Sequence, residues 1–277
     1  AGARNAVRLM LGNVAGVSEY ERRPFWRMPE RAGWGLYGLA ELDAATRKGY
    51  SDVGSQRTFA ALFNFCTGEL SSVYLGMRKD ALYCDDAASI TRRACRTVLD
   101  HLFTCVVTWL APMLCFTMEE AWLTRFGGEE ESVHLQIFPD VPGEWRDDEL
   151  GRKFAAMRTV RRVVTGALEL ERAEKRIGAS LEAAPVLYLS DAELLGAIDG
   201  LDMAELCITS AFALKPLAEA PQGAFRLAES KDRLAVFIER AKGGKCARCW
   251  KILPDVGAHE AAPGTCARCA GVLAGRG

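Results

Sequence analysis

The 277-residue sequence has almost no net charge, because 35 lysines and arginines are balanced by 36 aspartates and glutamates. This balance excludes a uniformly basic protein of the histone kind and a strongly acidic disordered tail. Long apolar runs are also absent: the longest uncharged stretch, residues 102–118, has 17 residues and contains Pro112. Since a membrane span needs about 20 apolar residues, we expect this stretch to be a buried bundle helix.

Signatures of common catalytic sites are missing as well. There is no Gly-rich loop ending in Lys-Ser or Lys-Thr and no G-x-S-x-G turn, which argues against phosphate-loop NTPases and α/β-hydrolases. Arg4 and Arg8 interrupt any apolar segment at the start, so no signal peptide is expected. The first residue is Ala1 and a helical pattern begins at once, so we expect a piece of a longer protein.

The balanced total hides segregated charge. Residues 119–149 carry ten acids and two arginines, whereas 152–176 carry eight bases and three acids. Residues 240–277 carry seven bases and two acids. Segregation of this kind indicates a face that binds an anion, most often nucleic acid, although a solvated face can produce the same pattern.

The first half of the chain has the periodicity of a helical bundle. Apolar residues recur at three- and four-residue spacing over 57–78, and the proline inside a further segment, 89–125, is expected to kink or break that helix. Helices over 4–11, ended by Gly12, and from Pro29 onwards complete the set. Four helices with short connections predict an antiparallel bundle.

The pattern changes after residue 128. Residues 132–138 alternate as an extended strand or arm would, and a fifth helix is predicted over 149–176, with an arginine-rich face opposite its apolar face. Short β-rich runs at 186–189 and 234–238 flank a helix candidate at 191–198. The expected fold class is therefore mainly α, with three parts: a helical bundle at 1–142, a small α+β module at 143–242 and a cysteine-bearing segment at 243–277.

The ten cysteines fall into two groups. Two pairs, Cys246-x2-Cys249 and Cys266-x2-Cys269, are separated by 16 residues near the end. This spacing is typical of a tetrahedral zinc site in a reducing compartment rather than of a disulfide framework. The other six stand singly at apolar or helical positions, where reduced cysteine behaves as a small hydrophobe: Cys66, Cys84, Cys95, Cys105, Cys115 and Cys207.

Cys246, Cys249, Cys266 and Cys269 are therefore the predicted ligands of one Zn²⁺. Four protein ligands leave no position for water, so the site is expected to be structural. About 35 residues cannot bury enough apolar surface to fold alone, and the metal would supply the stability. Two alternatives stay open: free or disulfide-linked cysteines, and replacement of one ligand by His259.

Trp250 lies between Arg248 and Lys251, next to a predicted ligand. An aromatic ring on a metal-pinned turn with cations beside it can stack on a nucleic-acid base, but it can equally pack over the metal as the core of that segment. The arginine face of 149–176 has two interpretations as well. It can contact phosphates, or it can be a solvated face that pairs with the acidic residues 119–149.

The ending KCARCWKILPDVG, followed by CARC, resembles the C-terminal zinc-binding segment of bacterial isoleucyl-tRNA synthetases. This resemblance implies an α-helical anticodon-binding domain at 1–142, an α+β junction at 143–242 and a four-cysteine zinc-binding module at 243–277. Further strings agree in family order over essentially the whole chain: RNAVRLMLGN from residue 4, ALFNFC at 61–66, RKDALYCD at 78–85, RRACRTVLDHLF at 92–103, TWLAPMLCFTMEEAW at 108–122 and ERAEKRIGASLEA at 171–183.

The resemblance implies a parent protein that attaches isoleucine to its tRNA with ATP, through an isoleucyl-adenylate. The catalytic domain, with HIGH-like and KMSKS-like motifs, and the editing domain would precede Ala1, so ATP and isoleucine would bind there and no catalytic residue is expected here. A cytoplasmic monomer without a membrane partner is implied. By matched motif, the expected contacts to tRNA-Ile are Arg4, Asn5, Arg8, Arg172, Lys175, Arg176, Arg248, Trp250 and Lys251.

Two other functions stay open. A DNA glycosylase of the formamidopyrimidine type carries a similar four-cysteine finger, but it needs an N-terminal proline followed by glutamate, and this chain begins Ala-Gly-Ala. A free-standing, non-catalytic tRNA- or protein-binding paralogue would be recognised by a reading frame that does not continue upstream. Five glycines stand where the resemblance leads us to expect helix-favouring or polar residues and predict weakened helices: Gly33, Gly35, Gly38, Gly68 and Gly76.

Overall fold

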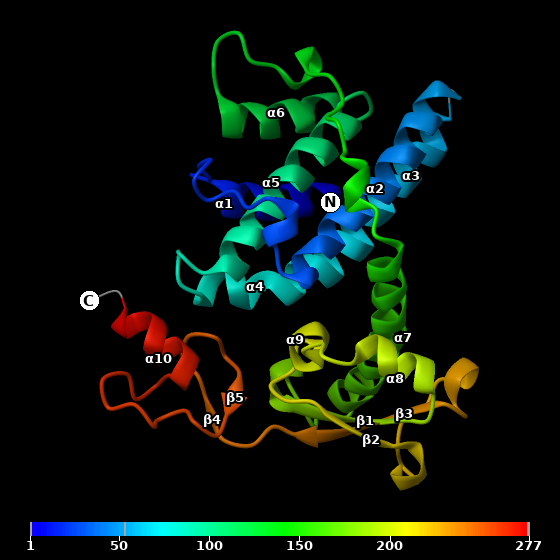
Figure 1. Cartoon of the computed structure of the whole chain (residues 1–277), viewed down its shortest axis with the longest axis vertical. Helices are drawn as coiled ribbons and strands as arrows, with labels where there is room; N and C mark the ends of the chain where they lie inside the picture. The colour runs from blue at the N-terminus through cyan, green and yellow to red at the C-terminus, as the bar shows by residue number, and fades with distance from the viewer. Residues whose placement is uncertain (1, 53, 276–277) are drawn as a thin grey trace. The chain divides into compact units, whose positions relative to one another are not determined.

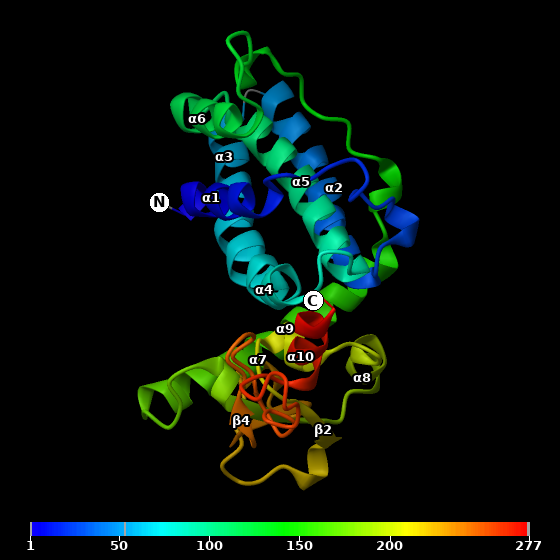
Figure 2. The same cartoon turned by 90° about the vertical axis from the view of Figure 1, so that its left-hand side faces the viewer.

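The computed structural model describes residues 2–52 and 54–275, and the chain divides into two compact units, 1–151 and 152–277. Figures 1 and 2 show the helices and strands from two directions. Among the described residues, no helix combines the length and the apolar character that a membrane crossing requires. The uncharged stretch 102–118 is divided between two helices of the first unit.

The first unit is built from helices, as the periodicity predicts. Short 3-10 turns at Phe25–Arg27, Val133–Leu135 and Gly143–Trp145 connect or follow them. The helices are α1 (Gly2–Val14), α2 (Glu30–Ser51), α3 (Ser55–Asn64), a π-helical segment (Phe65–Tyr74), α4 (Leu75–Cys84), α5 (Ile90–Leu110) and α6 (Cys115–Phe126).

Helix α5 is the centre of this unit, because α1, α2, α4 and α6 all pack against it. Figure 2 shows α2 running alongside α5. Phe103 and Trp109 on α5 have no exposed surface, and truncating a buried aromatic residue to alanine typically costs about 3–5 kcal/mol. The mainly α fold and the helical bundle are thus confirmed.

The boundaries differ from the prediction in places. The break at Pro112 is confirmed, since α5 ends at Leu110 and α6 begins at Cys115. The stripe over 57–78 follows one helical path, but its middle is wound as a π-helix. Helix α1 continues past the predicted end at Gly12 because the left-handed position lies further on, at Gly16 with φ +68°.

The strand predicted over 132–138 is wrong. Ser132 begins a 3-10 turn and its hydroxyl accepts a hydrogen bond from the backbone N–H of His134 at 3.1 Å. Glu119 on α6 accepts from the backbone N–H of Val133 at 2.8 Å, which fixes the turn on the bundle. Only Val133 of this apolar alternation is buried, and the described part of the unit contains no strand with which the segment could pair.

Helix α7 (Asp148–Ala173) begins at the end of the first unit and continues into the second. The second unit also contains a three-stranded sheet in the order β2-β1-β3. Strand β1 pairs in parallel with β2 and antiparallel with β3. Helix α7 ends three residues before the predicted Arg176, because Lys175 takes the left-handed backbone conformation with φ +58°. The remaining elements are β1 (Ala183–Leu189), α8 (Ala192–Ile198), α9 (Met203–Cys207), β2 (Ala213–Pro216), β3 (Leu234–Arg240), β4 (Gly244–Lys245), β5 (Ile252–Leu253) and α10 (Ala267–Ala274).

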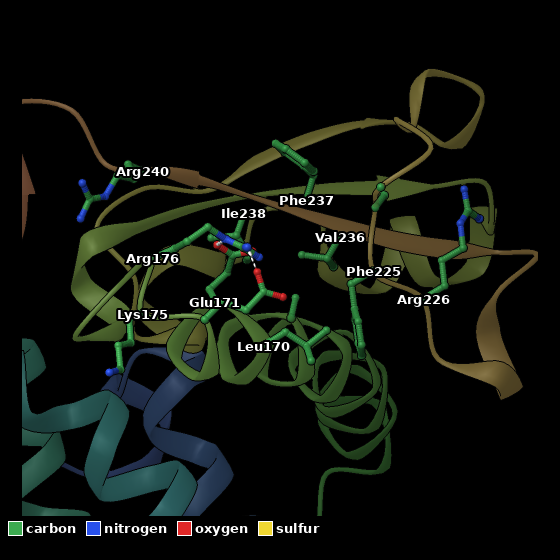
Figure 3. Close-up of a pocket in the computed structure, with 14 residues that line it drawn as sticks. Leu170, Glu171, Lys175, Arg176, Phe225, Arg226, Val236, Phe237, Ile238 and Arg240 are labelled. Atoms are coloured by element: carbon green, nitrogen blue, oxygen red, sulfur yellow. Dashed lines mark hydrogen bonds and ion pairs between the residues drawn. The ribbon is translucent and has the colours of Figure 1, made fainter.

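The strand register separates the two faces of the sheet. Val186 is opposite Phe237, and Tyr188 is opposite Ala235, so these side chains share one face. Leu187 and Val236 form the pair on the other face, along which α7 runs (Figure 3). The α+β character expected of this part of the chain is confirmed.

The glycines of α2 are positions of close helix contact. A Cβ atom at Gly35 would overlap Cγ1 of Val98 on α5, and one at Gly33 would lie 2.9 Å from Cδ2 of Leu150. At Gly38 the nearest atom belongs to Phe65, at 3.1 Å. The low helix propensity of these glycines is therefore offset by packing that larger residues would prevent, whereas Gly68 has open space around it.

We predict that Gly35→Ala lowers the free energy of unfolding by about 1 kcal/mol. Overpacking against Val98 costs about 1–3 kcal/mol, which outweighs the gain of up to about 1 kcal/mol in helix propensity. Gly68→Ala is the matched control and should leave stability unchanged or raise it. Urea unfolding followed by helical circular dichroism measures both, and a Gly35→Ala chain as stable as the wild type would contradict the close-packing explanation.

Candidate metal centre and nucleic-acid interface

The first cysteine pair is held by a short hairpin of β4 and β5, in which Lys245 pairs with Ile252. Cys246 follows β4 directly; its N–H donates to the carbonyl of Lys251, and its carbonyl accepts from the N–H of Trp250, both at 2.9 Å. The hairpin requires glycine at 243: φ is +117°, and a Cβ there would overlap the carbonyl oxygen of Leu253.

The second pair lies at the start of α10. Cys266 precedes the first residue of this helix and Cys269 lies in its first turn. The N–H of Ala267 donates to Oδ2 of Asp255 at 2.7 Å, and the N–H of Ala247 donates to the carbonyl of Gly264 at 2.8 Å. These bonds hold the helix start against the turn that carries the first pair.

The four cysteine sulfurs meet at one point, with all four Sγ atoms within 4.8 Å of one another. The Sγ atoms of Cys249 and Cys266 are 3.9 Å apart. A tetrahedral zinc with Zn–S bonds of about 2.3 Å places its sulfurs about 3.8 Å apart, so the donor set fits this ion. All four are free cysteines, and the cluster contains no histidine, so neither disulfide pairing nor a ligand role for His259 is supported.

The cluster is electrostatically different from the single cysteines. Burial disfavours the charged form of the Cys246 thiol, but backbone N–H groups of Cys249, Cys266 and Arg248 donate to it and lower its pKa to about 6. Burial, together with the neighbouring sulfurs, raises the pKa of Cys249 and of Cys269, because adjacent thiolates repel one another without a cation between them. Burial alone raises the pKa of the isolated Cys66 thiol to about 12.

Trp250 is presented outward from this centre. Its side chain is 63% exposed, and its backbone has φ +65°, an uncommon conformation for a tryptophan. The hydrogen bond from its N–H to Cys246 holds that conformation. The ring therefore does not form the buried core of the metal segment, which was one of the two interpretations open from the sequence.

Arg4, Asn5 and Arg8 lie together on the exposed face of α1, opposite the buried residues Ala6 and Met10. All three line a hollow of about 480 Å³ towards α6, and Asn5 and Arg8 also line a hollow of about 430 Å³ towards α4. Arg4 forms an exposed ion pair with Glu120 at 3.4 Å. Sequence reasoning missed Tyr83, which lines the second hollow and whose hydroxyl accepts from Nδ2 of Asn13 at 3.0 Å.

Three arginines on or just after α7 pair with carboxylates of their own unit. Arg162 pairs with Glu229, Arg172 with Glu169, and Arg176 with Glu171 and Glu174. Hydrogen bonding to Arg176 lowers the pKa of Glu171, so this carboxylate stays charged and the guanidinium keeps its position.

Two family models match the chain, one over the helical bundle and one over the four-cysteine centre that follows it in the sequence. The model for the anticodon-binding domain of tRNA ligases matches residues 32–188, and a model for the zinc finger found in FPG and IleRS matches residues 243–271. The first match covers more than half of the chain. The chain therefore belongs to the anticodon-binding domain family of tRNA ligases.

Curated relatives make the similarity more specific. The isoleucine–tRNA ligase of Brucella abortus is 50% identical over 270 residues, which are 98% of this chain and 27% of the relative. Those of Agrobacterium fabrum and Ruegeria pomeroyi are 48% and 49% identical, again over 98% of this chain and 28% of their own length. The chain spans about a quarter of the length of these relatives.

We predict that Cys246→Ser releases the metal and unfolds the segment 243–275 while leaving the helical bundle folded. The reason is that a hairpin and one short helix bury too little apolar surface without the metal. Zinc content by mass spectrometry and helical circular dichroism measure the two effects, with Cys115→Ser, an exposed single cysteine, as the control. Wild-type protein that is expressed with ample zinc and still contains none would contradict the assignment.

Proposed function

We propose that this chain is the tRNA-binding C-terminal region of an isoleucine–tRNA ligase and contacts the anticodon side of tRNA-Ile. The observation that carries the proposal is the exposed Trp250 ring, held by a four-cysteine centre behind a domain of the anticodon-binding family. Aromatic rings on rigid supports stack on unpaired bases, which is how proteins usually recognise single-stranded loops of RNA.

One structural zinc completes the proposal. Cys246, Cys249, Cys266 and Cys269 would hold it, and the ion would neutralise thiolates that otherwise repel one another. Its role would be to fix the turn bearing Trp250 and the neighbouring cations Arg248 and Lys251. The three-part division at residues 142 and 242 belongs to this proposal, and the hydrogen bond from Ile252 N–H to Ser210 Oγ at 2.8 Å joins the third part to the second.

The remaining expected contacts fit the same role. The exposed α1 face offers the guanidinium groups of Arg4 and Arg8 and the amide of Asn5, which can bind phosphates and base edges. Lys175 and Arg176 follow α7, with Arg172 in its last turn. Phosphate contacts of this kind position RNA without reading its sequence.

The parent protein would use ATP and isoleucine in a catalytic domain outside this chain, and an editing domain would accompany it. The names of the relatives support ligase activity for the parent. A cytoplasmic monomer is the setting we propose. The match to the anticodon-binding family favours neither a DNA glycosylase, whose resemblance is limited to the finger, nor a free-standing paralogue.

We predict that Trp250→Ala weakens binding of a tRNA-Ile transcript by about 1–3 kcal/mol, the typical value of one base–aromatic stack. Trp250→Phe should retain most of the affinity, and Tyr20→Ala, which removes a 93% exposed aromatic elsewhere, should retain all of it. Fluorescence anisotropy at several salt concentrations measures these affinities. Equal affinity of wild type and Trp250→Ala, with zinc content unchanged, would rule out stacking.

We also predict that the isolated chain does not form isoleucyl-adenylate, because no nucleotide-binding motif occurs in its sequence. Isoleucine-dependent exchange of pyrophosphate into ATP measures this reaction. The control is a full-length relative under the same conditions. Exchange above background by the purified 277-residue chain would show that a catalytic site is present and would contradict this part of the proposal.

A further inference from the structure

The second unit has a hollow surface that shares no residue with the metal centre. A pocket of about 960 Å³ opens between the C-terminal half of α7 and the outer edge of β3 (Figure 3). Its floor is apolar and consists of Leu170 on α7, Val236 and Ile238 on β3, and Phe225. Leu170 is 49% exposed, so its side chain is accessible to a ligand from solvent.

The Phe225 ring is fixed in place. Its backbone N–H donates to the carbonyl of Val236 at 2.7 Å, and its carbonyl accepts from the N–H of Val236 at 2.9 Å. A Cβ atom at Gly166 of α7 would lie 2.8 Å from Cε1 and Cζ of the ring, so the glycine lets the edge of the ring lie directly against the helix backbone. The pocket therefore has a preformed apolar surface rather than a mobile side chain.

Cations stand at both ends of this floor. Arg226 lies at one end, and Lys175, Arg176 and Arg240 lie at the other (Figure 3). Two of these cations are already paired: Glu171 holds Arg176 through two hydrogen bonds of 2.6 Å and Glu174 also pairs with it, while Arg240 pairs with Glu182 at 3.9 Å. Among the residues that the structure describes, neither Lys175 nor Arg226 has a carboxylate within ion-pairing distance.

Arg226 is positioned by a neutral partner instead of a carboxylate. One of its Nη atoms donates to the backbone carbonyl of Lys231 at 2.5 Å, so the guanidinium is held while its charge remains available. The β3 backbone adds polar groups to the same pocket. Since Val236 directs its N–H and C=O towards Phe225 at the outer edge, Ile238, two residues further, directs its own towards the same edge.

We infer that this pocket binds one unpaired nucleotide of an RNA chain. The base would lie on the apolar floor over Leu170 and Phe225, with its edge facing the backbone groups of Ile238. The phosphates on either side would meet Arg226 at one end and Lys175 at the other. Fixed cations separated by an apolar hollow suit a single-stranded segment that crosses the pocket. The inference rests on the proposed function and adds a second contact, distinct from Trp250.

Two substitutions test the pocket in the full chain. Leu170→Glu places a carboxylate where the base would lie and should weaken binding of a fluorescent tRNA-Ile transcript at least tenfold. Arg226→Gln removes one phosphate contact, which should weaken binding about three- to tenfold and lower the slope of log K against log salt by about 0.7. Both residues are exposed enough that the fold should persist, which circular dichroism verifies.

Matched controls separate the pocket from general charge effects. Leu195→Glu introduces the same carboxylate at a 44% exposed leucine on α8, and Lys215→Gln removes one charge on β2, at the opposite edge of the sheet. Both should bind within twofold of wild type. A fully paired RNA hairpin of similar length should bind more weakly than the tRNA and should not distinguish Arg226→Gln from wild type.

The outcomes distinguish this inference from the proposed function. If the wild-type chain does not bind tRNA-Ile, the proposed function fails. If it binds and the pocket variants match their controls, the pocket inference alone is overturned. The same holds if Arg226→Gln lowers the affinity for the paired hairpin as much as the affinity for tRNA-Ile. AMP measured by calorimetry should bind no more tightly than about 1 mM; tight AMP binding that Leu170→Glu abolishes would assign the pocket to a free nucleotide instead of RNA.

Discussion

The convergence of four cysteine sulfurs within 4.8 Å is the constraint on which the C-terminal segment of this molecule depends. The segment that carries them has two strands of two residues and a helix of eight residues, which is far too little to form an independent core. A cation shared by the sulfurs would both remove their mutual repulsion and fix the turn at Trp250. The uncommon backbone conformation of this tryptophan is tolerated because the metal centre and the bond to Cys246 determine the turn.

The helical bundle depends on a different constraint, which is the close approach of its long helices. Gly33, Gly35 and Gly38 allow α2 to approach its neighbours at distances that side chains would prevent. The same glycines looked like defects in the sequence, since propensity considers one helix at a time. Helix α1 packs on the bundle through its apolar face, so Arg4, Asn5 and Arg8 on its polar face are exposed to solvent.

Much of this architecture could be predicted from the sequence. Apolar periodicity located the bundle helices, Pro112 located the break between α5 and α6, and the spacing of the cysteine pairs predicted their convergence. The strand prediction over residues 132–138 was wrong because an alternating pattern does not form a strand without a neighbouring strand to pair with. The pocket beside β3 could not be foreseen, since a single bridge between Phe225 and Val236 brings together residues that no local motif connects.

The central claim is that a metal-pinned module reads the anticodon side of tRNA-Ile. The most direct measurement compares the affinities of the chain for tRNA-Ile and for a transcript with an altered anticodon, before and after removal of zinc by a chelator. The account predicts a clear preference for tRNA-Ile that disappears with the metal, while weak, salt-sensitive binding to both RNAs persists. Equal affinity for the two transcripts in the zinc-loaded chain would contradict it.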